Sequence, residues 1–230
     1  SGFNTWSHTW AYSVQETNGW GVRYRGVVAR GQDGAEAMVA GFVVQGKSVG
    51  TTFEHTAVFN AYVGYWVLGS EAEGGAWLHT SMVGGSRGYH VNLTAGRPGW
   101  QFNHVHADVR NIGIFLQHAA QAVIDSSLIY KQVGSTLDWN GVAAIDGSDF
   151  LRLTGTHFTD NAQHGTAAHA IVLAGSEGAR IGDNTGSFLD RFVWLQVGTT
   201  NSTVHDNRHY AGSDVTVLDQ GTNSLLHHNQ

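Results

Sequence analysis

The stretch that decides the fold is residues 181–207, which read IGDNTGSFLDRFVWLQVGTTNSTVHDN. The opening Ile181-Gly182-Asp183-Asn184 returns 23 residues later as Val204-His205-Asp206-Asn207. Between the two copies lies FVWLQVG, an apolar run with the composition of a β-strand closed by a glycine. Internal repetition with a period of about 20 to 50 residues is the signature of a solenoid. We therefore expect a chain of stacked turns.

The same unit can be followed along most of the chain. Its first part is an apolar residue followed by polar or small corner residues, and its copies start at Phe53, Leu78, Phe102, Ile124, Leu153, Ile181, Val204 and Leu226. The spacings are 25, 24, 22, 29, 28, 23 and 22 residues. A second, apolar strand follows each start, as in YWVLG at residues 65–69. The two longest spacings predict insertions around residues 135–140 and 162–168, and insertions in solenoids often gather on the binding face.

The composition agrees with short strands and tight corners. Only 13% of the residues are charged, while the chain has 31 glycines and one proline. With 12 Lys and Arg and a net charge of −6, it lacks the basic surface that a nucleic acid requires. No run approaches the roughly 18 apolar residues of a membrane span, and the first residues show no basic region before an apolar stretch, which is the pattern of a signal peptide. We expect no nucleic-acid partner and no membrane insertion, and the absence of cysteine excludes disulfides.

Turns of 22–29 residues that contain short strands and no helical pattern predict an all-β, right-handed, single-stranded parallel β-helix. Leucine-rich repeats have a similar period, but their fixed leucine spacing is missing. We expect one domain over residues 1–230, with less regular opening turns at 1–52 and regular turns at 53–230. The ends of the sequence predict a fragment of a longer chain.

The apolar-x-x-Asn corner and the glycine-closed strand resemble the β-helix superfamily of pectate lyases, phage tailspikes and related polysaccharide-active proteins. The resemblance covers roughly residues 53–229, and the tailspike branch is the most similar, with its low charge and lack of cysteine. It implies a polysaccharide or oligosaccharide partner, a homotrimer, and an extracellular or virion-tail location. The Arg-x-Pro-x-x-Arg motif of calcium-dependent lyases is not present, because Arg97-Pro98-Gly99-Trp100 departs from it after the proline.

Two acidic residues share one position of consecutive turns. Stacking places the Cα atoms of Asp183 and Asp206 about 5 Å apart, the spacing that the two carboxylates of a retaining glycosidase use. The alternative is that both are corner residues, because Asp and Asn tolerate the left-handed conformation and bond their own backbone. By the same logic, an amide ladder is expected along the stacked asparagines Asn184, Asn207 and Asn229.

The two insertions lie on consecutive turns and carry further candidates. We expect Asp138, Asp149, Asp160 and His164 to converge on one wall, with Asp149 and Asp160 as catalytic carboxylates and Asp138 and His164 as substrate-binding residues. The alternative is that they are solvated loop residues. The pair His104-Val105-His106 lacks a third ligand, so we predict no metal and no cofactor.

The tryptophans are unevenly placed within their turns, so they cannot all face inward. A ring on the outer face of a solenoid offers a flat apolar platform for a sugar, with neighbouring Asn, Gln and His as hydrogen-bonding groups. Trp139 lies in an insertion, and Trp194 lies between Val193 and Leu195, which should both face inward. We expect Trp139 and Trp194 to bind substrate, the alternative being that they pack against another turn or subunit.

Taken with the resemblance, these residues predict a tailspike-like domain that hydrolyses a bacterial surface glycan, either a capsule or an O-antigen, with acidic residues. Hydrolysis is favoured over β-elimination because no calcium or Arg/Lys base constellation stands out. The alternatives are a non-catalytic carbohydrate-binding adhesin, or the structural shaft of a phage fibre or of a secreted autotransporter passenger.

Overall fold

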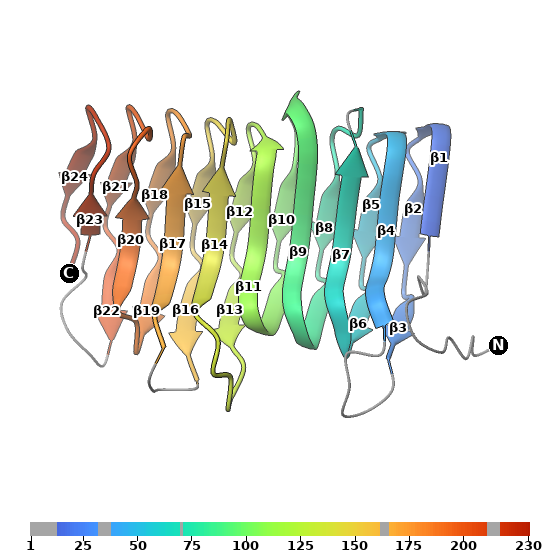
Figure 1. Cartoon of the computed structure of the whole chain (residues 1–230), viewed down its shortest axis with the longest axis horizontal. Coiled ribbons are helices and arrows are strands. Elements are labelled where there is room, and N and C mark those ends of the chain that lie inside the picture. The colour runs from blue at the N-terminus through green and yellow to red at the C-terminus, as the bar shows by residue number, and fades with distance from the viewer. Residues whose placement is uncertain (1–12, 32–37, 70, 162–165, 211–216) are drawn as a thin grey trace.

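Every strand pairs in parallel with the strand one turn before or after it, so the chain winds into a right-handed parallel β-helix, as predicted (Figure 1). The computed structural model describes residues 13–31, 38–69, 71–161, 166–210 and 217–230, of which residues 13–19 are described by their backbone only. No helix occurs within these ranges. The described residues therefore include no helix that could span a membrane.

The strands form two sheets. Sheet B contains nine short strands: β2 (Arg23–Arg25), β5 (Thr52–Glu54), β8 (Ala76–Leu78), β10 (Gln101–Asn103), β12 (Val123–Asp125), β15 (Arg152–Thr154), β18 (Arg180–Gly182), β21 (Thr203–His205) and β24 (Leu225–His227). Sheet A contains fifteen: β1 (Ser13–Trp20), β3 (Val28–Arg30), β4 (Met38–Val49), β6 (Ala57–Phe59), β7 (Ala61–Gly69), β9 (Ser81–Arg97), β11 (His106–Ala119), β13 (Leu128–Lys131), β14 (Trp139–Ile145), β16 (His157–Asp160), β17 (Ala168–Ala174), β19 (Thr185–Ser187), β20 (Arg191–Leu195), β22 (Arg208–Tyr210) and β23 (Val217–Asp219).

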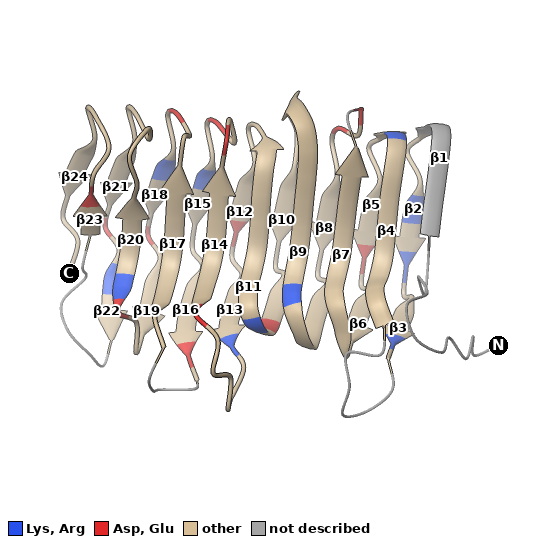
Figure 2. Cartoon of the chain, in the orientation of Figure 1, with Lys and Arg blue, Asp and Glu red and all other residues tan. Residues whose placement is uncertain are grey.

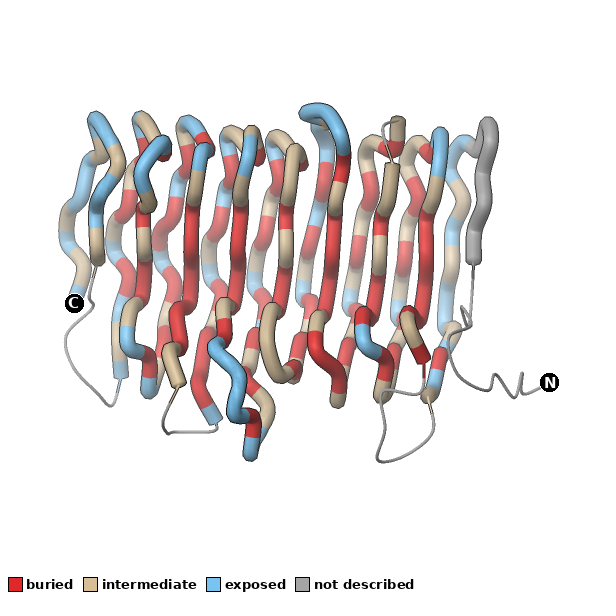
Figure 3. Tube along the Cα trace, viewed as in Figure 1, coloured by how far each residue is buried: buried red, intermediate tan, exposed pale blue. Residues whose placement is uncertain are grey.

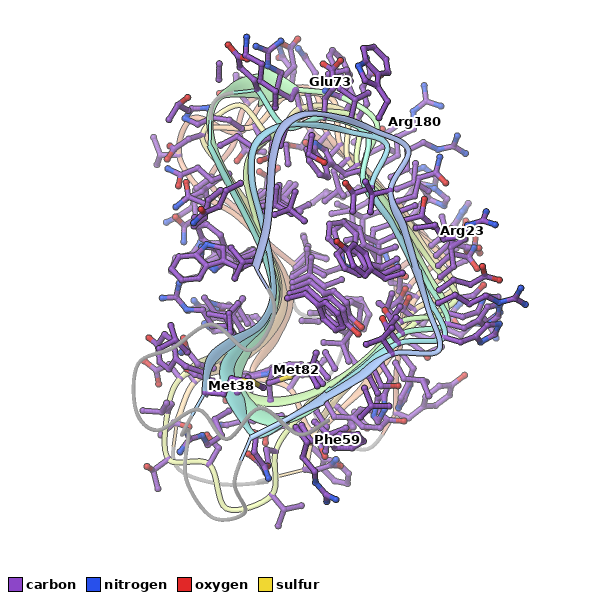
Figure 4. The ribbon with its side chains drawn as sticks, turned by 90° about the vertical axis from the view of Figure 1, so that its right-hand side faces the viewer. Arg23, Met38, Phe59, Glu73, Met82 and Arg180 are labelled. Atoms are coloured by element: carbon purple, nitrogen blue, oxygen red, sulfur yellow. The ribbon has the colours of Figure 1, made fainter. Side chains whose placement is uncertain are left out.

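Each turn has three sides, which the view along the axis shows (Figure 4). Sheet B forms one side. Sheet A forms the other two: a short-strand side (β3, β6, β13, β16, β19, β22) and a long-strand side (β1, β4, β7, β14, β17, β20, β23). Strands β9 and β11 run without a break from the first of these to the second.

The registers of sheet B confirm the predicted repeat, with one correction. Phe102, Ile124, Leu153, Ile181, Val204 and Leu226 are stacked as expected. In the second predicted turn, however, Phe53 pairs with Trp77 and not with Leu78, so that alignment was one residue late. Tyr24 also pairs with Phe53, which places one further turn before the predicted start of the regular repeat.

After each sheet B strand the chain turns through a residue with positive φ. This corner residue is Gly26, His55, His79, His104, Ser126, Gly155, Asp183, Asp206 or His228. The predicted amide ladder stands directly behind the last corners: Asn184 Nδ2 donates to Asn207 Oδ1 at 3.0 Å, and Asn207 Nδ2 donates to Asn229 Oδ1 at 2.9 Å. Left-handed corners and a buried ladder are therefore what the Asp-Asn repeat encodes.

Buried residues recur along the strands of successive turns (Figure 3). The core contains stacked rings in the N-terminal turns and mainly aliphatic side chains in the C-terminal turns. Tyr65 and Tyr89 stack at 4.9 Å, and Trp77 and Phe102 at 4.6 Å. Each of these two buried tyrosine hydroxyls is hydrogen-bonded to a threonine that follows a sheet B corner, as Tyr89 is to Thr80 at 2.9 Å. Burial raises the pKa of both tyrosines, so they remain neutral.

A column of glycines shapes the long-strand side where it bends. Gly41, Gly64, Gly88, Gly113 and Gly141 each precede an inward residue, and a Cβ on any of them would come within 3 Å of the carbonyl oxygen of the next turn. The same Cβ would also meet core side chains, such as Ile129 Cγ2 at 2.4 Å from Gly113. None of the five has positive φ, so close approach and not backbone conformation requires glycine here.

Candidate functional site

The outer face of the long-strand side carries one column of ring and aliphatic side chains, which we call the ring stripe. Its members are Val43, Trp66, His90, Phe115, Ala143, Val172, Trp194 and Leu218, each paired in register with the next. Their neighbours in each strand, such as Tyr65 and Val67, point into the core, while Val43 and Trp66 belong to a separate apolar cluster. The stripe therefore lies on the outer side of the sheet and not in the solenoid core. Its half-buried members are Trp66, Phe115, Trp194 and Leu218, while Val43, His90, Ala143 and Val172 are buried.

The first ring group of the stripe spans three consecutive turns. His90 stacks on Phe115 with ring centroids 4.5 Å apart, and Trp66 meets His90 edge-on at 5.7 Å. Trp66 and Phe115 are half-buried, whereas His90 is buried. Burial, and secondarily the neighbouring Arg87, lowers the pKa of His90 to about 3. The imidazole is therefore neutral at physiological pH and acts as an uncharged ring.

The second ring group is built around Trp194. The Arg191 guanidinium lies over its ring, 4.8 Å from the centroid, and His169 packs edge-on at 5.4 Å. The indole Nε1–H donates to Gln220 Oε1 at 3.1 Å, which fixes the orientation of the ring. Burial is the largest cause of the lowered pKa of His169, followed by Arg191. The half-buried Trp194 ring is thus held in place by polar groups.

Polar side chains flank the stripe on both sides. Asn92 and Gln117 are paired in register on one side, and Asn140 and His169 on the other. His169 Nδ1 has no hydrogen-bond partner among the described residues, so it has unused hydrogen-bonding capacity. Figure 2 shows few charges on the long strands. Flat rings bordered by amides and imidazoles can hold a polar molecule that also has apolar faces, which is the chemistry of a sugar.

The structure separates Asp149 from the other described members of the predicted acidic wall. Asp138 precedes β14 and Asp149 follows it, so a strand of seven residues, about 23 Å long, lies between them. Asp183 and Asp206 lie in a third place, the corner after sheet B, where both have positive φ. The catalytic and substrate-binding roles of these carboxylates stay predictions, but Asp149 does not share a wall with Asp138.

Asp160 lies inside the fold and not on a surface. The residue is 3% exposed, and its Oδ2 accepts from Nζ of Lys131, which is 0% exposed, at 3.4 Å. Lys131 also donates to Thr166 Oγ1 at 2.7 Å, and Asp138 Oδ1 accepts from the backbone N–H of Ala167 at 3.0 Å. These groups tie the two insertions together. His164 lies outside the described residues.

The two tryptophan predictions have different outcomes. Trp139 is fully buried at 0% exposure, so its expected role as an exposed platform is wrong. The insertion ends before this residue, and Trp139 begins β14 as a core side chain. Trp194 faces outward between buried Val193 and Leu195, as predicted.

Sequence reasoning selected only Trp194 from the ring stripe; it gave Trp66 no binding role and missed the rings of His90 and Phe115. Both occupy the position that Trp66 and Trp194 occupy in their own turns, and an alignment of the second strands by register exposes this equivalence. Elsewhere, His79 and His104 stack at 4.8 Å as corner residues. Within the described part of the chain, no three His, Asp or Glu side chains gather in a way that could hold a metal ion.

The geometry of the described residues establishes a β-helix fold and a column of rings on its outer side. Comparison with known proteins adds no family assignment, because no family model, no curated protein and no solved structure matches the chain.

Proposed function

We propose that this chain binds an extended carbohydrate along the ring stripe. The observation that carries the proposal is the stacking of Trp66, His90 and Phe115 in three consecutive turns of one outer face, with Trp194 in the same column. Trp66, Phe115 and Trp194 are each exposed in part, and a column of such rings along turns about 4.8 Å apart suits a polymer with a regular repeat better than a small molecule.

The chemistry of the stripe also favours a glycan over a protein partner. The half-buried rings of Trp66, Phe115 and Trp194 supply apolar faces, and the buried His90 between the first two stays uncharged because its pKa is lowered to about 3. Asn92, Gln117 and Asn140 supply amides that can both donate and accept hydrogen bonds. Sugars need this combination, because their ring faces are apolar and their hydroxyls are polar.

The resemblance of the repeat to tailspike proteins supports a narrower proposal, in which the glycan is a bacterial capsule or O-antigen. Under this proposal the chain acts outside the cell or on a virion tail, as a homotrimer. An adhesin or a fibre shaft with the same stripe is the alternative form of the same binding function.

Binding to a panel of capsular and O-antigen polysaccharides tests the proposal. Trp194→Ala and Phe115→Ala each remove one ring from the stripe, and we expect about tenfold weaker binding from the loss of ring contact. Tyr210→Ala is the matched control, because Tyr210 is a 53% exposed ring on the short-strand side. Equal affinity of all three variants and the wild type would refute the proposal.

A second candidate function is glycan hydrolysis at the corner of Asp183 and Asp206, which follow the paired residues Gly182 and His205 of adjacent strands. His205 Nδ1 lies 2.9 Å from Asp206 Oδ2, and this hydrogen bond is the main cause of the lowered pKa of Asp206. An ionised Asp206 beside a second carboxylate suits a nucleophile and an acid.

Release of new reducing ends from the polysaccharide panel tests hydrolysis. Asp206→Asn and Asp183→Asn should each abolish the release while leaving binding intact, since neither residue belongs to the ring stripe. Polysaccharide that is bound but never cut assigns the chain to the binding class, and cutting that survives both substitutions excludes this corner as the catalytic site.

A further inference from the structure

Two arginines lie side by side on the outer face of sheet B. Arg152 of β15 and Arg180 of β18 are register partners, and both are exposed. Figure 2 shows the two basic bands on neighbouring strands, and Figure 4 shows Arg180 pointing away from the core. Like charges directly opposite each other destabilise a sheet. Among the described residues, neither guanidinium has an ion-pair or hydrogen-bond partner that offsets this cost.

An exposed aromatic ring completes the surface. Phe150 stands two residues before Arg152 and is 52% exposed, while the intervening Leu151 points inward. The Phe150 ring lies against Gly178, where an added Cβ would be 2.7 Å from its Cδ1. Gly178 in turn stands two residues before Arg180, and the ring therefore lies beside both strands that carry the arginines.

Two carboxylates in this part of the solenoid, those of Asp149 and Glu177, form no ion pair with the two guanidiniums. Asp149 Oδ1 accepts the backbone N–H of Glu177 at 2.8 Å, and Glu177 Oε1 accepts Asn201 Nδ2 at 3.1 Å. Both acidic side chains are hydrogen-bonded to loop residues of the next turn. On a chain with a net charge of −6, this leaves a local pair of free cations beside an exposed ring.

We propose that Phe150, Arg152 and Arg180 form a binding site for an anionic saccharide, in which the sugar ring lies on Phe150 and its carboxylate or sulfate bonds to the two guanidiniums. Arginine binds such groups through two parallel N–H donors, so the adjacent pair offers a fork for one anionic group. The site lies on sheet B and not on the ring stripe. This proposal rests on the proposed carbohydrate binding and adds that the glycan is anionic, but it concerns different residues.

The test is titration calorimetry of the full chain with three probes: an oligogalacturonate, a sulfated dextran oligomer, and neutral dextran of matched length. We expect at least one anionic probe to bind about tenfold more tightly than neutral dextran. Arg152→Gln and Arg180→Gln should each remove most of this preference, and added salt should weaken it. Preference for the galacturonate, for the sulfate or for both identifies the group that the site accepts.

Matched control variants distinguish the loss of the binding site from a general folding defect. Phe150→Asn removes the ring at a residue with φ of 59°, a conformation that asparagine accepts, and should weaken anionic binding. Phe188→Asn makes the same change at φ 59° on a 45% exposed ring elsewhere, and Arg208→Gln removes an exposed arginine of β22. Both controls should bind as the wild type does.

The proposal is overturned if neither anionic probe is preferred, or if the control variants lose as much affinity as the site variants. Failure of the ring stripe is distinguishable, because Trp194→Ala should leave the preference for the anionic probe unchanged.

Discussion

The asparagine ladder gives the sharpest test of how the repeat stabilises the fold. Asn207 is fully buried, and its side chain makes four hydrogen bonds. It accepts from the backbone N–H and from Nδ2 of Asn184, at 3.1 and 3.0 Å. It donates to the Ile181 carbonyl at 3.3 Å and to Asn229 Oδ1 at 2.9 Å.

Asn207→Ala removes all four bonds and leaves their partners inside the fold, where water does not replace them. At about 1 kcal/mol net for each bond, we expect the free energy of unfolding to fall by roughly 3–5 kcal/mol. Asn140→Ala is the control, because it removes a half-exposed amide from a regular strand, and it should cost less than about 1 kcal/mol.

Urea unfolding measures the loss, and hydrogen exchange locates it. The backbone amide of Asn184, held by Asn207 Oδ1, should lose protection in the variant. A loss in Asn207→Ala no greater than that in Asn140→Ala, with the Asn184 amide still protected, would refute the claim that the ladder holds the C-terminal turns together.

Three further predictions address the bend, the insertions and the acid response. Gly113→Ala places a Cβ 2.5 Å from the Gly141 carbonyl oxygen and should lower the free energy of unfolding by about 1–3 kcal/mol, measured by thermal unfolding. An unchanged Tm would mean that the backbone at the bend relaxes to accept the Cβ. Lys131→Met leaves Asp160 buried without its cation and should lower the free energy of unfolding by about 3–5 kcal/mol. The double variant with Asp160→Leu should recover most of this loss, and a double variant no more stable than the single one would contradict the prediction. Because the pKa of His90 falls from 6.5 to about 3 on folding, the unfolded chain binds the extra proton between these values. Stability should therefore drop by up to about 1.4 kcal/mol per pH unit below pH 6.5, and His90→Phe should flatten this slope in urea titrations at several pH values; an identical slope would exclude His90 as its source.

The repeat made most of the fold predictable from sequence. Corner pairs such as Asp206-Asn207 recur with the period of one turn, and most of the apolar residues before the corners are core residues in the structure, namely Phe53, Phe102, Ile124, Leu153, Ile181 and Val204. The misalignment at Leu78 arose because Trp77 and Leu78 are both apolar, so the pattern did not indicate which one faces inward. Pairing with Phe53 selects the larger ring for the core.

The site was harder to predict because it depends on where the insertions begin and end. Asp138 and Asp149 are close in sequence, but the strand between them places them at opposite ends of one side of the solenoid. Trp139 reads as an insertion residue although it starts that strand, and it is therefore buried. Neither outcome follows from the spacing of the repeats, since the spacing gives the length of a turn and not the position of its bends.

The glycine column is a repeat that the sequence contains and from which the bend could have been predicted. Each of its members stands directly before an inward residue, as in Gly64-Tyr65 and Gly88-Tyr89. A repeated glycine at one position of each turn predicts close backbone approach there. This approach forms the bend of the long-strand side.

The most direct test of carbohydrate binding at the ring stripe is an NMR titration of the indole N–H signals. The ¹⁵N-labelled chain is titrated with the polysaccharides of the panel, and Trp66 and Trp194 are assigned by substitution with phenylalanine. We predict that a bound glycan shifts the signals of these two half-buried indoles and leaves those of the buried Trp77, Trp100 and Trp139 in place. Binding that moves neither Trp66 nor Trp194, or the absence of binding across the whole panel, would contradict the account.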